Sequence, residues 1–141
     1  MNITVIGTGY VGLVTGTCFA EMGNTVICVD IDRNKIDNLN KGKCPIYEPG
    51  LEELILQNGK VGRLSFSISL EESMKESNIL IIAVGTPESK SGKVNMEYIY
   101  NVAREIGKNI ERKSVIINKS TAPVGTADKV QSIIAKELNK R

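Results

Sequence analysis

Three glycines near the N-terminus constrain the fold of this chain more than any other feature of its sequence. Gly7, Gly9 and Gly12 form a Gly-x-Gly-x-x-Gly motif. The motif follows a short β-branched run, residues 2–6, and opens a segment of helical periodicity, residues 10–22. A strand, this turn and a helix in succession form the phosphate-binding unit of dinucleotide-binding folds. The first glycine allows the tight turn, the second lets the backbone approach a pyrophosphate, and the third lets the helix pack closely on the strand.

The start of the predicted helix is the expected position of the pyrophosphate. Backbone N–H groups in the first turn of a helix lack intrahelical partners, and the helix dipole places partial positive charge there. The motif therefore predicts cofactor contacts at Gly7, Gly9, Tyr10, Val11 and Gly12. The alternative is a glycine-rich turn that binds nothing, which the flanking strand and helix disfavour.

Asp30 predicts which dinucleotide binds. It directly follows a second apolar run, residues 25–29, and lies 18 positions after Gly12. A carboxylate at about this distance accepts hydrogen bonds from the adenosine ribose of NAD and repels the 2′-phosphate of NADP. We therefore expect NAD as the cofactor. Asp32 lies close enough to be an alternative, but it does not directly follow the apolar run, and a solvated strand-end aspartate is the remaining explanation.

Two basic residues follow Asp30. Lys35 could reach the adenosine from the helix predicted over residues 33–40, and Arg33 could contact its edge. Either could also be an ordinary solvated helix charge. Because an arginine near this position can accommodate a 2′-phosphate, Arg33 leaves some room for NADP.

Strand and helix signals alternate along the whole chain. Strands are predicted over residues 2–6, 25–29, 64–68, 78–84 and 114–117. Helices are predicted over residues 10–22, 33–40, 51–57, 70–76, 96–109 and 126–139. The alternation predicts βαβ units, and the nearly continuous apolar strands predict a parallel sheet covered on both faces. We therefore expect an α/β fold, a Rossmann-type, doubly wound parallel sheet in three layers.

Two loops after predicted strands carry threonines beside glycine and proline. Thr86 lies in a Val-Gly-Thr-Pro sequence, and Thr121 lies in a Ser-Thr-Ala-Pro-Val-Gly sequence. Ligands of open α/β sheets bind beyond the carboxyl ends of the strands, so both hydroxyls are candidates for cofactor contacts. A plain strand-to-helix connection with threonine as the helix cap explains each loop equally well.

Composition excludes several classes of function. The 141 residues are 41% hydrophobic and 24% charged, with a net charge of +2, as in a soluble globular domain. The chain has no lysine–arginine run for nucleic acid and no apolar run near the ~20 residues of a membrane helix. Its glycine-broken N-terminus does not resemble a secretion signal, so we expect a cytoplasmic protein.

The reactive side chains offer no familiar catalytic set. The sequence has no histidine, and Cys18, Cys28 and Cys44 have no metal-ligand spacing, which argues against a zinc centre or a Ser-His-Asp triad. Cys18 lies in a predicted helix and Cys28 in a predicted strand, so we expect both to be inert core thiols. Cys44 lies in a polar loop, residues 41–50.

Five separate segments resemble the UDP-glucose/GDP-mannose dehydrogenase family. They are GTGYVGLVTG at 7–16, VDID at 29–32 with Lys35 after it, PIYEPGLEEL at 45–54, VGTP at 84–87 and KSTAPVGT at 119–126. They cover essentially the whole chain in order, with Ala122 where the family usually has valine. The resemblance implies the cofactor half of an enzyme that oxidises the C6 alcohol of a nucleotide sugar to a carboxylate in two NAD-dependent steps. The UDP-glucose 6-dehydrogenases are the members it resembles most.

The resemblance also implies roles for single residues. It places Asp30 and Lys35 at the adenosine ribose and Thr86 and Thr121 further along the cofactor, with a second role for Thr121 in positioning a catalytic water. The catalytic cysteine of the family lies in a later segment, which none of the three cysteines matches. We therefore expect residues 1–141 to be an incomplete N-terminal NAD-binding domain, cut before its last strand, that does not oxidise the sugar by itself.

The resemblance leaves the substrate open. We expect the full-length protein to be a homodimer that binds NAD and UDP-glucose. GDP-mannose or a UDP-N-acetylhexosamine are alternative substrates, because the cofactor half is much the same in those enzymes. A stand-alone NAD-sensing module is a further alternative, although the KSTAPVGT and EPGL segments have no obvious use in a bare sensor.

Overall fold

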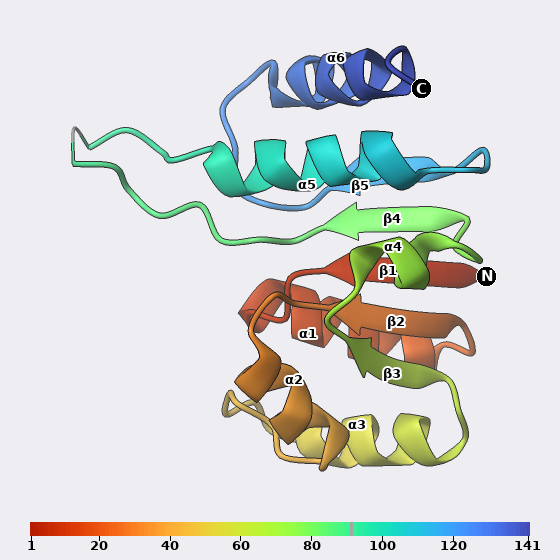
Figure 1. Cartoon of the computed structure of the whole chain (residues 1–141). Coiled ribbons are helices and arrows are strands. Elements are labelled where there is room, and N and C mark those ends of the chain that lie inside the picture. The colour runs from red at the N-terminus through yellow and green to blue at the C-terminus, as the bar shows by residue number, and fades with distance from the viewer. Residues whose placement is uncertain (91) are drawn as a thin grey trace.

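Five strands form a parallel sheet in the computed structural model, which describes residues 1–90 and 92–141. The strands are β1 (Asn2–Ile6), β2 (Thr25–Val29), β3 (Leu64–Ser67), β4 (Ile79–Ile82) and β5 (Val115–Asn118). Their order is β3-β2-β1-β4-β5, so the chain starts in the middle of the sheet, builds one edge and then crosses to the other (Figure 1). The direction reverses at β1, and in such folds the carboxyl ends of the strands at this point open a crevice for ligands.

Six helices alternate with the strands. They are α1 (Tyr10–Glu21), α2 (Arg33–Asn40), α3 (Leu51–Lys60), α4 (Leu70–Met74), α5 (Glu97–Asn109) and α6 (Thr126–Leu138). Helices α1, α2 and α3 contribute to one hydrophobic core, and α4, α5 and α6 contribute to a second. No helix in the described residues is long and apolar enough to span a membrane. The predicted three-layer, Rossmann-type α/β fold is confirmed.

The two cores lie on opposite faces of the sheet because side chains alternate along each strand. On β1, Ile3 and Val5 belong to the core of α1 to α3, whereas Ile6 belongs to the core of α5 and α6. On β4, Ile81 and Ile82 divide between the cores in the same way. Both faces of the central strands are therefore apolar, which is why their sequences read as continuous apolar runs.

The predicted elements are all present, and their boundaries shift by at most a few residues. The largest shift is in α3, which continues to Lys60 instead of ending at residue 57. The extension is stabilised by Asn58, a polar residue that is fully buried on the last turn. Its side-chain amide donates hydrogen bonds to Glu21 Oε2 at 2.8 Å and to the Leu54 carbonyl at 2.9 Å. The partner on α1, Glu21, is 37 positions away and could not be read from local sequence.

Cys18 is exposed, so the expectation that it is a core thiol is wrong. The face of α1 that is buried consists of Gly12, Leu13, Gly16, Thr17 and Ala20. Small residues occupy it because α1 lies very close to β2, and a Cβ on Gly16 would be 2.4 Å from the Cys28 sulfur. Cys28 is buried as expected, and burial raises the pKa of its thiol to about 12.

Buried hydroxyl groups attach the short helix α4 to the sheet. Thr4 on β1 is fully buried, and its hydroxyl donates to the Ser73 carbonyl at 2.7 Å. The Ser77 hydroxyl lies 2.5 Å from the Thr4 hydroxyl and also donates to the Ser73 carbonyl at 3.1 Å. The contact fixes α4 over β1, and a pocket lies between α4 and α5 on the same face of the sheet.

Candidate functional site

The glycine turn joins β1 to α1 at the carboxyl edge of the sheet. Gly7 has a φ of +106°, in the region of backbone space that favours glycine. Its N–H donates to the Val29 carbonyl at 2.7 Å, which ties the turn to the end of β2. A Cβ on Gly7 would also lie 2.4 Å from the Ala83 carbonyl oxygen. Both the backbone conformation and the available space therefore require glycine at the start of the turn.

Gly12 and Gly9 differ in what surrounds them. A Cβ on Gly12 would lie 1.9 Å from the Gly7 carbonyl oxygen, so its absence lets α1 sit directly on the turn. A Cβ on Gly9 would have no neighbouring atom within 4 Å, and its φ of −71° is ordinary. Contacts with the described residues therefore give no reason for glycine at position 9. The open space beside Gly9 allows a ligand to approach the backbone of the turn.

The N-terminus of α1 has free capacity for an anion. Its cap residue, Gly9, makes no side-chain hydrogen bond, and its first turn contains no acidic residue. Helices α2 and α4 are capped by Asp32 and Ser69, and α3, α5 and α6 each have an acidic residue in the first turn. Among the described helices, α1 alone has neither. Its unpaired N–H groups and its dipole are thus left without compensation from the chain itself.

Asp30 faces the glycine turn and is held by it. Its Oδ2 accepts hydrogen bonds from the Thr8 N–H at 2.9 Å and the Thr8 hydroxyl at 2.8 Å, and its Oδ1 accepts from the Asp32 N–H at 3.0 Å. Lys35 Nζ lies 3.5 Å from Oδ2. Burial by itself would raise the pKa of Asp30, but these hydrogen bonds and the charge of Lys35 bring the pKa below its ordinary value. Asp30 is therefore an ionised carboxylate with a fixed orientation.

The two aspartates that follow β2 have different positions. Asp32 is exposed and caps α2, since its Oδ1 accepts a hydrogen bond from the Lys35 N–H at 3.1 Å. Asp30 is half-buried and lines the pocket beside the glycine turn. Arg33 is exposed and does not line that pocket. The geometry thus favours Asp30 over Asp32 as the acceptor for a ligand.

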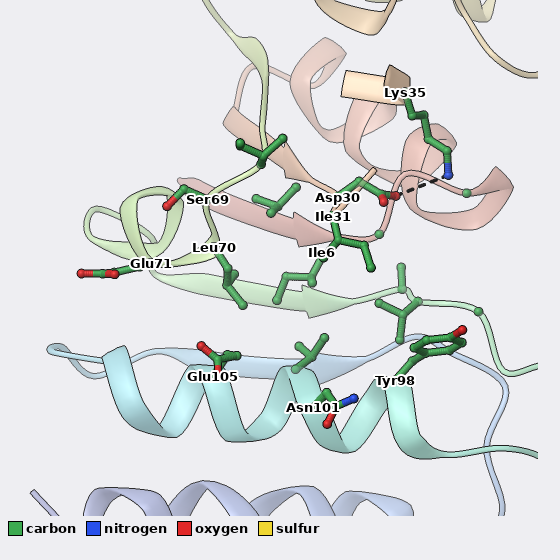
Figure 2. A pocket seen from close by; sticks show the side chains of 18 of the residues that line it. Ile6, Asp30, Ile31, Lys35, Ser69, Leu70, Glu71, Tyr98, Asn101 and Glu105 are labelled. Atoms are coloured by element: carbon green, nitrogen blue, oxygen red, sulfur yellow. Dashed lines mark ion pairs between the residues drawn. The ribbon is translucent and has the colours of Figure 1, made fainter. Parts of the chain in front are cut away.

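A pocket of about 880 Å³ extends from the glycine turn across the sheet between α4 and α5 (Figure 2). At one end lies the ion pair of Asp30 and Lys35, and Tyr98 extends from α5 at that same end, across the pocket from the pair (Figure 2). Apolar side chains such as Ile31 and Val102 form much of the lining. A carboxylate acceptor beside apolar walls can hold a ribose together with a flat base.

The two threonine loops meet at the carboxyl ends of neighbouring strands. Thr86 follows β4 and is half-buried, whereas Thr121 follows β5 and is exposed. The Ser120 hydroxyl ties the loops together by donating to the Val84 carbonyl at 2.8 Å. Neither threonine lines the pocket. The structure therefore brings Thr86 and Thr121 to the same edge as the glycine turn, but outside the cavity that contains Asp30.

Two residues of this region escaped the sequence analysis. Thr8 is 1% exposed and holds Asp30 through both its backbone and its hydroxyl. The signal for it was weak: one small hydroxyl residue between the first two glycines. Tyr98 gave no signal at all, because its place in the pocket depends on how α5 lies on the sheet.

The chain resembles characterised proteins along its whole length. A family model described as the NAD-binding domain of the UDP-glucose/GDP-mannose dehydrogenase family matches residues 1–141. The UDP-glucose 6-dehydrogenase YwqF of Bacillus subtilis is 51% identical over 138 residues, which are 98% of this chain and 31% of that protein.

Solved structures show the same likeness. A ternary complex of GDP-mannose dehydrogenase from Pseudomonas aeruginosa superposes with a TM-score of 0.93 at 40% identity, over 97% of this chain and 32% of the other. A UDP-glucose dehydrogenase from Pyrobaculum islandicum gives a TM-score of 0.91 at 37% identity, over 96% and 32%. The chain thus spans about a third of the length of these relatives. The match over every residue, on the fold and glycine turn described above, shows that the chain belongs to the UDP-glucose/GDP-mannose dehydrogenase family as an NAD-binding domain.

Proposed function

We propose that residues 1–141 form the cofactor-binding domain of a UDP-glucose 6-dehydrogenase, whose complete chain oxidises UDP-glucose to UDP-glucuronate with two NAD. One observation carries the proposal: an uncompensated helix N-terminus and an oriented carboxylate, that of Asp30, meet at one glycine turn. The helix N-terminus suits a pyrophosphate, and the carboxylate suits the hydroxyls of the adjoining ribose.

The pyrophosphate lies at the first turn of α1 in this proposal. Its oxygens accept hydrogen bonds from backbone N–H groups, and the absence of a Cβ on Gly9 leaves the necessary space. The residues that form this part of the proposed site are Gly7, Gly9, Tyr10, Val11 and Gly12. Gly7 and Gly12 act by shaping the turn, since both are tightly packed against it.

The adenosine occupies the pocket next to Asp30. Thr8 and Lys35 contact one carboxylate oxygen, Oδ2, whereas Oδ1 accepts a single hydrogen bond from the Asp32 N–H. A carboxylate oxygen has room for two such bonds, so Oδ1 retains capacity for a ribose hydroxyl. The negative charge of Asp30 disfavours a 2′-phosphate, which gives a preference for NAD over NADP.

The nicotinamide half of the cofactor extends toward Thr86 and Thr121. Both lie beyond the carboxyl ends of strands, on the side where ligands of open α/β sheets bind. The likeness of the chain to dehydrogenases supports this placement, with Thr121 as the residue that also positions a water for the second oxidation step. NAD supplies the hydride acceptor for each step.

The complete protein is proposed to be a cytoplasmic homodimer. Its substrate is UDP-glucose, because sequence identity is higher to the UDP-glucose 6-dehydrogenase YwqF of B. subtilis, at 51%, than to the GDP-mannose 6-dehydrogenase of P. aeruginosa, at 42%. The reacting thiol lies outside residues 1–141 in this proposal, since none of the three cysteines in the chain has the sequence setting of the family nucleophile. We therefore regard residues 1–141 as an incomplete domain of a longer enzyme.

Calorimetric titration tests the cofactor part of the proposal. Residues 1–141 should bind NAD with measurable heat and bind NADP roughly tenfold or more weakly, because the 2′-phosphate approaches an ionised Asp30. No heat with millimolar NAD, or equal affinity for both dinucleotides, contradicts it.

Assays of the complete protein test the substrate. UDP-glucose should yield two NADH per sugar, and GDP-mannose and UDP-N-acetylglucosamine should be poor substrates. A higher kcat/KM for one of those two sugar nucleotides than for UDP-glucose would contradict the proposed substrate and assign the protein to another branch of the family. Residues 1–141 alone should produce no NADH, and a natural reading frame that ends at Arg141 would favour an NAD-sensing module instead.

A further inference from the structure

The loop between α2 and α3, residues 41–50, is joined to the start of α1. Tyr10 is the first residue of α1, and its hydroxyl donates a hydrogen bond to Glu48 Oε2 at 2.5 Å. The two residues are 38 positions apart in the sequence. Within the described residues, this is the one hydrogen bond that links the loop to α1. The contact therefore fixes the loop relative to the proposed pyrophosphate site.

The rest of the loop is held from the inside of the protein. Cys44 and Ile46 pack against the first core, and the Cys44 thiol donates to the Ile46 carbonyl at 3.2 Å. Tyr47, next to Glu48, is 92% exposed and gives the outer part of the loop no packing. The Leu51 N–H donates to the Glu48 carbonyl at 3.1 Å and joins the outer part to α3, whereas the bond between Glu48 and Tyr10 joins it to α1.

The same bond determines what Tyr10 offers a ligand. Its hydroxyl hydrogen is engaged by Glu48, so the ring and the backbone N–H remain available, and the residue is 57% exposed. The hydrogen bond and the negative charge of Glu48 raise the pKa of Tyr10 above its ordinary value. Tyr10 therefore remains a neutral hydrogen-bond donor to Glu48.

We propose that Glu48 is a positioning residue of the cofactor site, which holds the Tyr10 ring and loop 41–50 against the first turn of α1 as a wall of the pyrophosphate site. The pocket contains Gly9 but not Tyr10, so this wall lies on the side of the turn away from the adenosine. The inference rests on the proposed placement of the pyrophosphate at α1.

Because Glu48 is negatively charged, an effect on Tyr10 can be distinguished from a direct attraction between Glu48 and the pyrophosphate. A carboxylate near the pyrophosphate repels it, so Glu48 can favour NAD only through the hydrogen bond that it accepts. Glutamine keeps a side-chain oxygen that accepts from Tyr10 and removes the charge. Positioning therefore predicts that Glu48→Gln binds NAD as well as the wild type or better, and that Glu48→Ala binds it less well.

NAD titration of single and double variants measures the effect. Tyr10→Phe and Glu48→Ala should each weaken binding about three- to tenfold, the size expected for loss of one hydrogen bond at an exposed position. The double variant should be no weaker than the weaker single variant, because both remove the same bond. Tyr47→Phe and Glu53→Gln, exposed positions nearby, are the matched controls and should bind as the wild type does.

Thiol labelling reports the loop itself. In a Cys18→Ser background, Cys44 should react with a maleimide about threefold or more faster in Glu48→Ala than in Glu48→Gln, because the loop opens without its outer bond. NAD should slow the labelling of Cys44. Cys28, which is fully buried, should stay unlabelled in every variant and so shows that the protein remains folded.

Three results overturn the proposal while leaving the cofactor site intact. They are wild-type affinity in Glu48→Ala, equal weakening in Glu48→Gln and Glu48→Ala, and effects of Tyr10→Phe and Glu48→Ala that multiply in the double variant. Failure of the wild type itself to bind NAD would instead remove both this inference and the proposed site.

Discussion

The two ends of the proposed cofactor site are built differently. At the adenosine end, Asp30 is held by Thr8, and a pocket of about 880 Å³ adjoins it. At the other end, Thr86 and Thr121 lie on loops outside that pocket, and Thr121 is exposed. One end is therefore a formed cavity with an oriented charge, whereas the other presents single side chains at the edge of the sheet.

The difference indicates where this chain holds its cofactor. An oriented carboxylate and a preformed pocket need little reorganisation on binding, so they contribute more affinity than side chains on exposed loops. The solved relatives are about three times as long as this chain, and in our proposal their further residues complete the nicotinamide end. Substitutions at the two ends of residues 1–141 should thus have very unequal effects on NAD affinity.

The largest effect is expected for Asp30→Asn. The change removes the ionised acceptor and leaves Lys35 without its partner, so NAD affinity should fall about 30-fold or more. The ratio of NAD to NADP affinity should also fall, because the repulsion of the 2′-phosphate is lost. Parallel titrations with both dinucleotides measure this, with Asp32→Asn as the matched control. A variant that keeps wild-type affinity and selectivity would show that Asp30 does not contact the ribose.

A smaller effect on NAD affinity is expected for substitutions in the glycine turn. There, Gly9→Ala and Gly12→Ala should differ clearly, because one should affect binding and the other stability. Gly9→Ala should leave the free energy of unfolding within about 0.5 kcal/mol of the wild type, since its Cβ meets no atom within 4 Å. It should weaken NAD binding roughly tenfold, because the Cβ occupies the space proposed for the pyrophosphate. Gly12→Ala should destabilise the fold by about 1–3 kcal/mol, because its Cβ would lie 1.9 Å from the Gly7 carbonyl oxygen.

Urea denaturation and NAD titration of the two glycine variants separate these roles. Normal NAD binding by Gly9→Ala would mean that the pyrophosphate does not lie against this backbone. Normal stability of Gly12→Ala would mean that α1 can move away from the turn without loss.

Thr8→Val tests how the oriented carboxylate is maintained. The change removes one of the two Thr8 hydrogen bonds to Asp30 from a residue that is 1% exposed, and should cost about 1–2 kcal/mol of stability and three- to fivefold in NAD affinity. The pKa of Asp30 should rise toward its ordinary value, because a donor to the ionised form is lost.

The pH dependence of stability in Thr8→Val follows from the sign of that shift. A lowered pKa in the folded state stabilises the protein above the ordinary pKa of aspartate, and this contribution is lost as the pH falls through the lowered value. The stability difference between wild type and Thr8→Val should therefore shrink in acid. Thr4→Val, which removes a buried hydrogen bond to the uncharged Ser73 carbonyl, is the control and should show a difference that does not change with pH. If the stability difference between wild type and Thr8→Val did not change with pH, Thr8 would not affect the ionisation of Asp30.

The contrast between predicted and unpredicted features has a physical origin. The elements, the sheet and the position of Asp30 beside the glycine turn could be predicted because periodicity, the glycine spacing and the end of an apolar strand are local signals. The orientation of α1 could not be predicted. Val11, Cys18 and Met22 recur at helical spacing, and so do the small residues on another face of the helix, which is the face that is buried. The contacts of Thr8 with Asp30 and of Tyr10 with Glu48 join residues 22 and 38 positions apart, and only the folded chain brings such pairs together.

The smallest effects are expected at the threonine end of the site. In residues 1–141, Thr86→Ala and Thr121→Ala should each change NAD affinity by less than about twofold, because a single hydroxyl on an open loop gains little when water can replace its partner. In the complete enzyme the same substitutions should lower kcat more than they raise KM, if the further residues close the nicotinamide end around them. Titration of the domain and steady-state kinetics of the enzyme give the two readouts. A loss of NAD affinity in the domain as large as that of Asp30→Asn would show that the threonine end is already formed in this chain, and the contrast between the two ends would no longer hold.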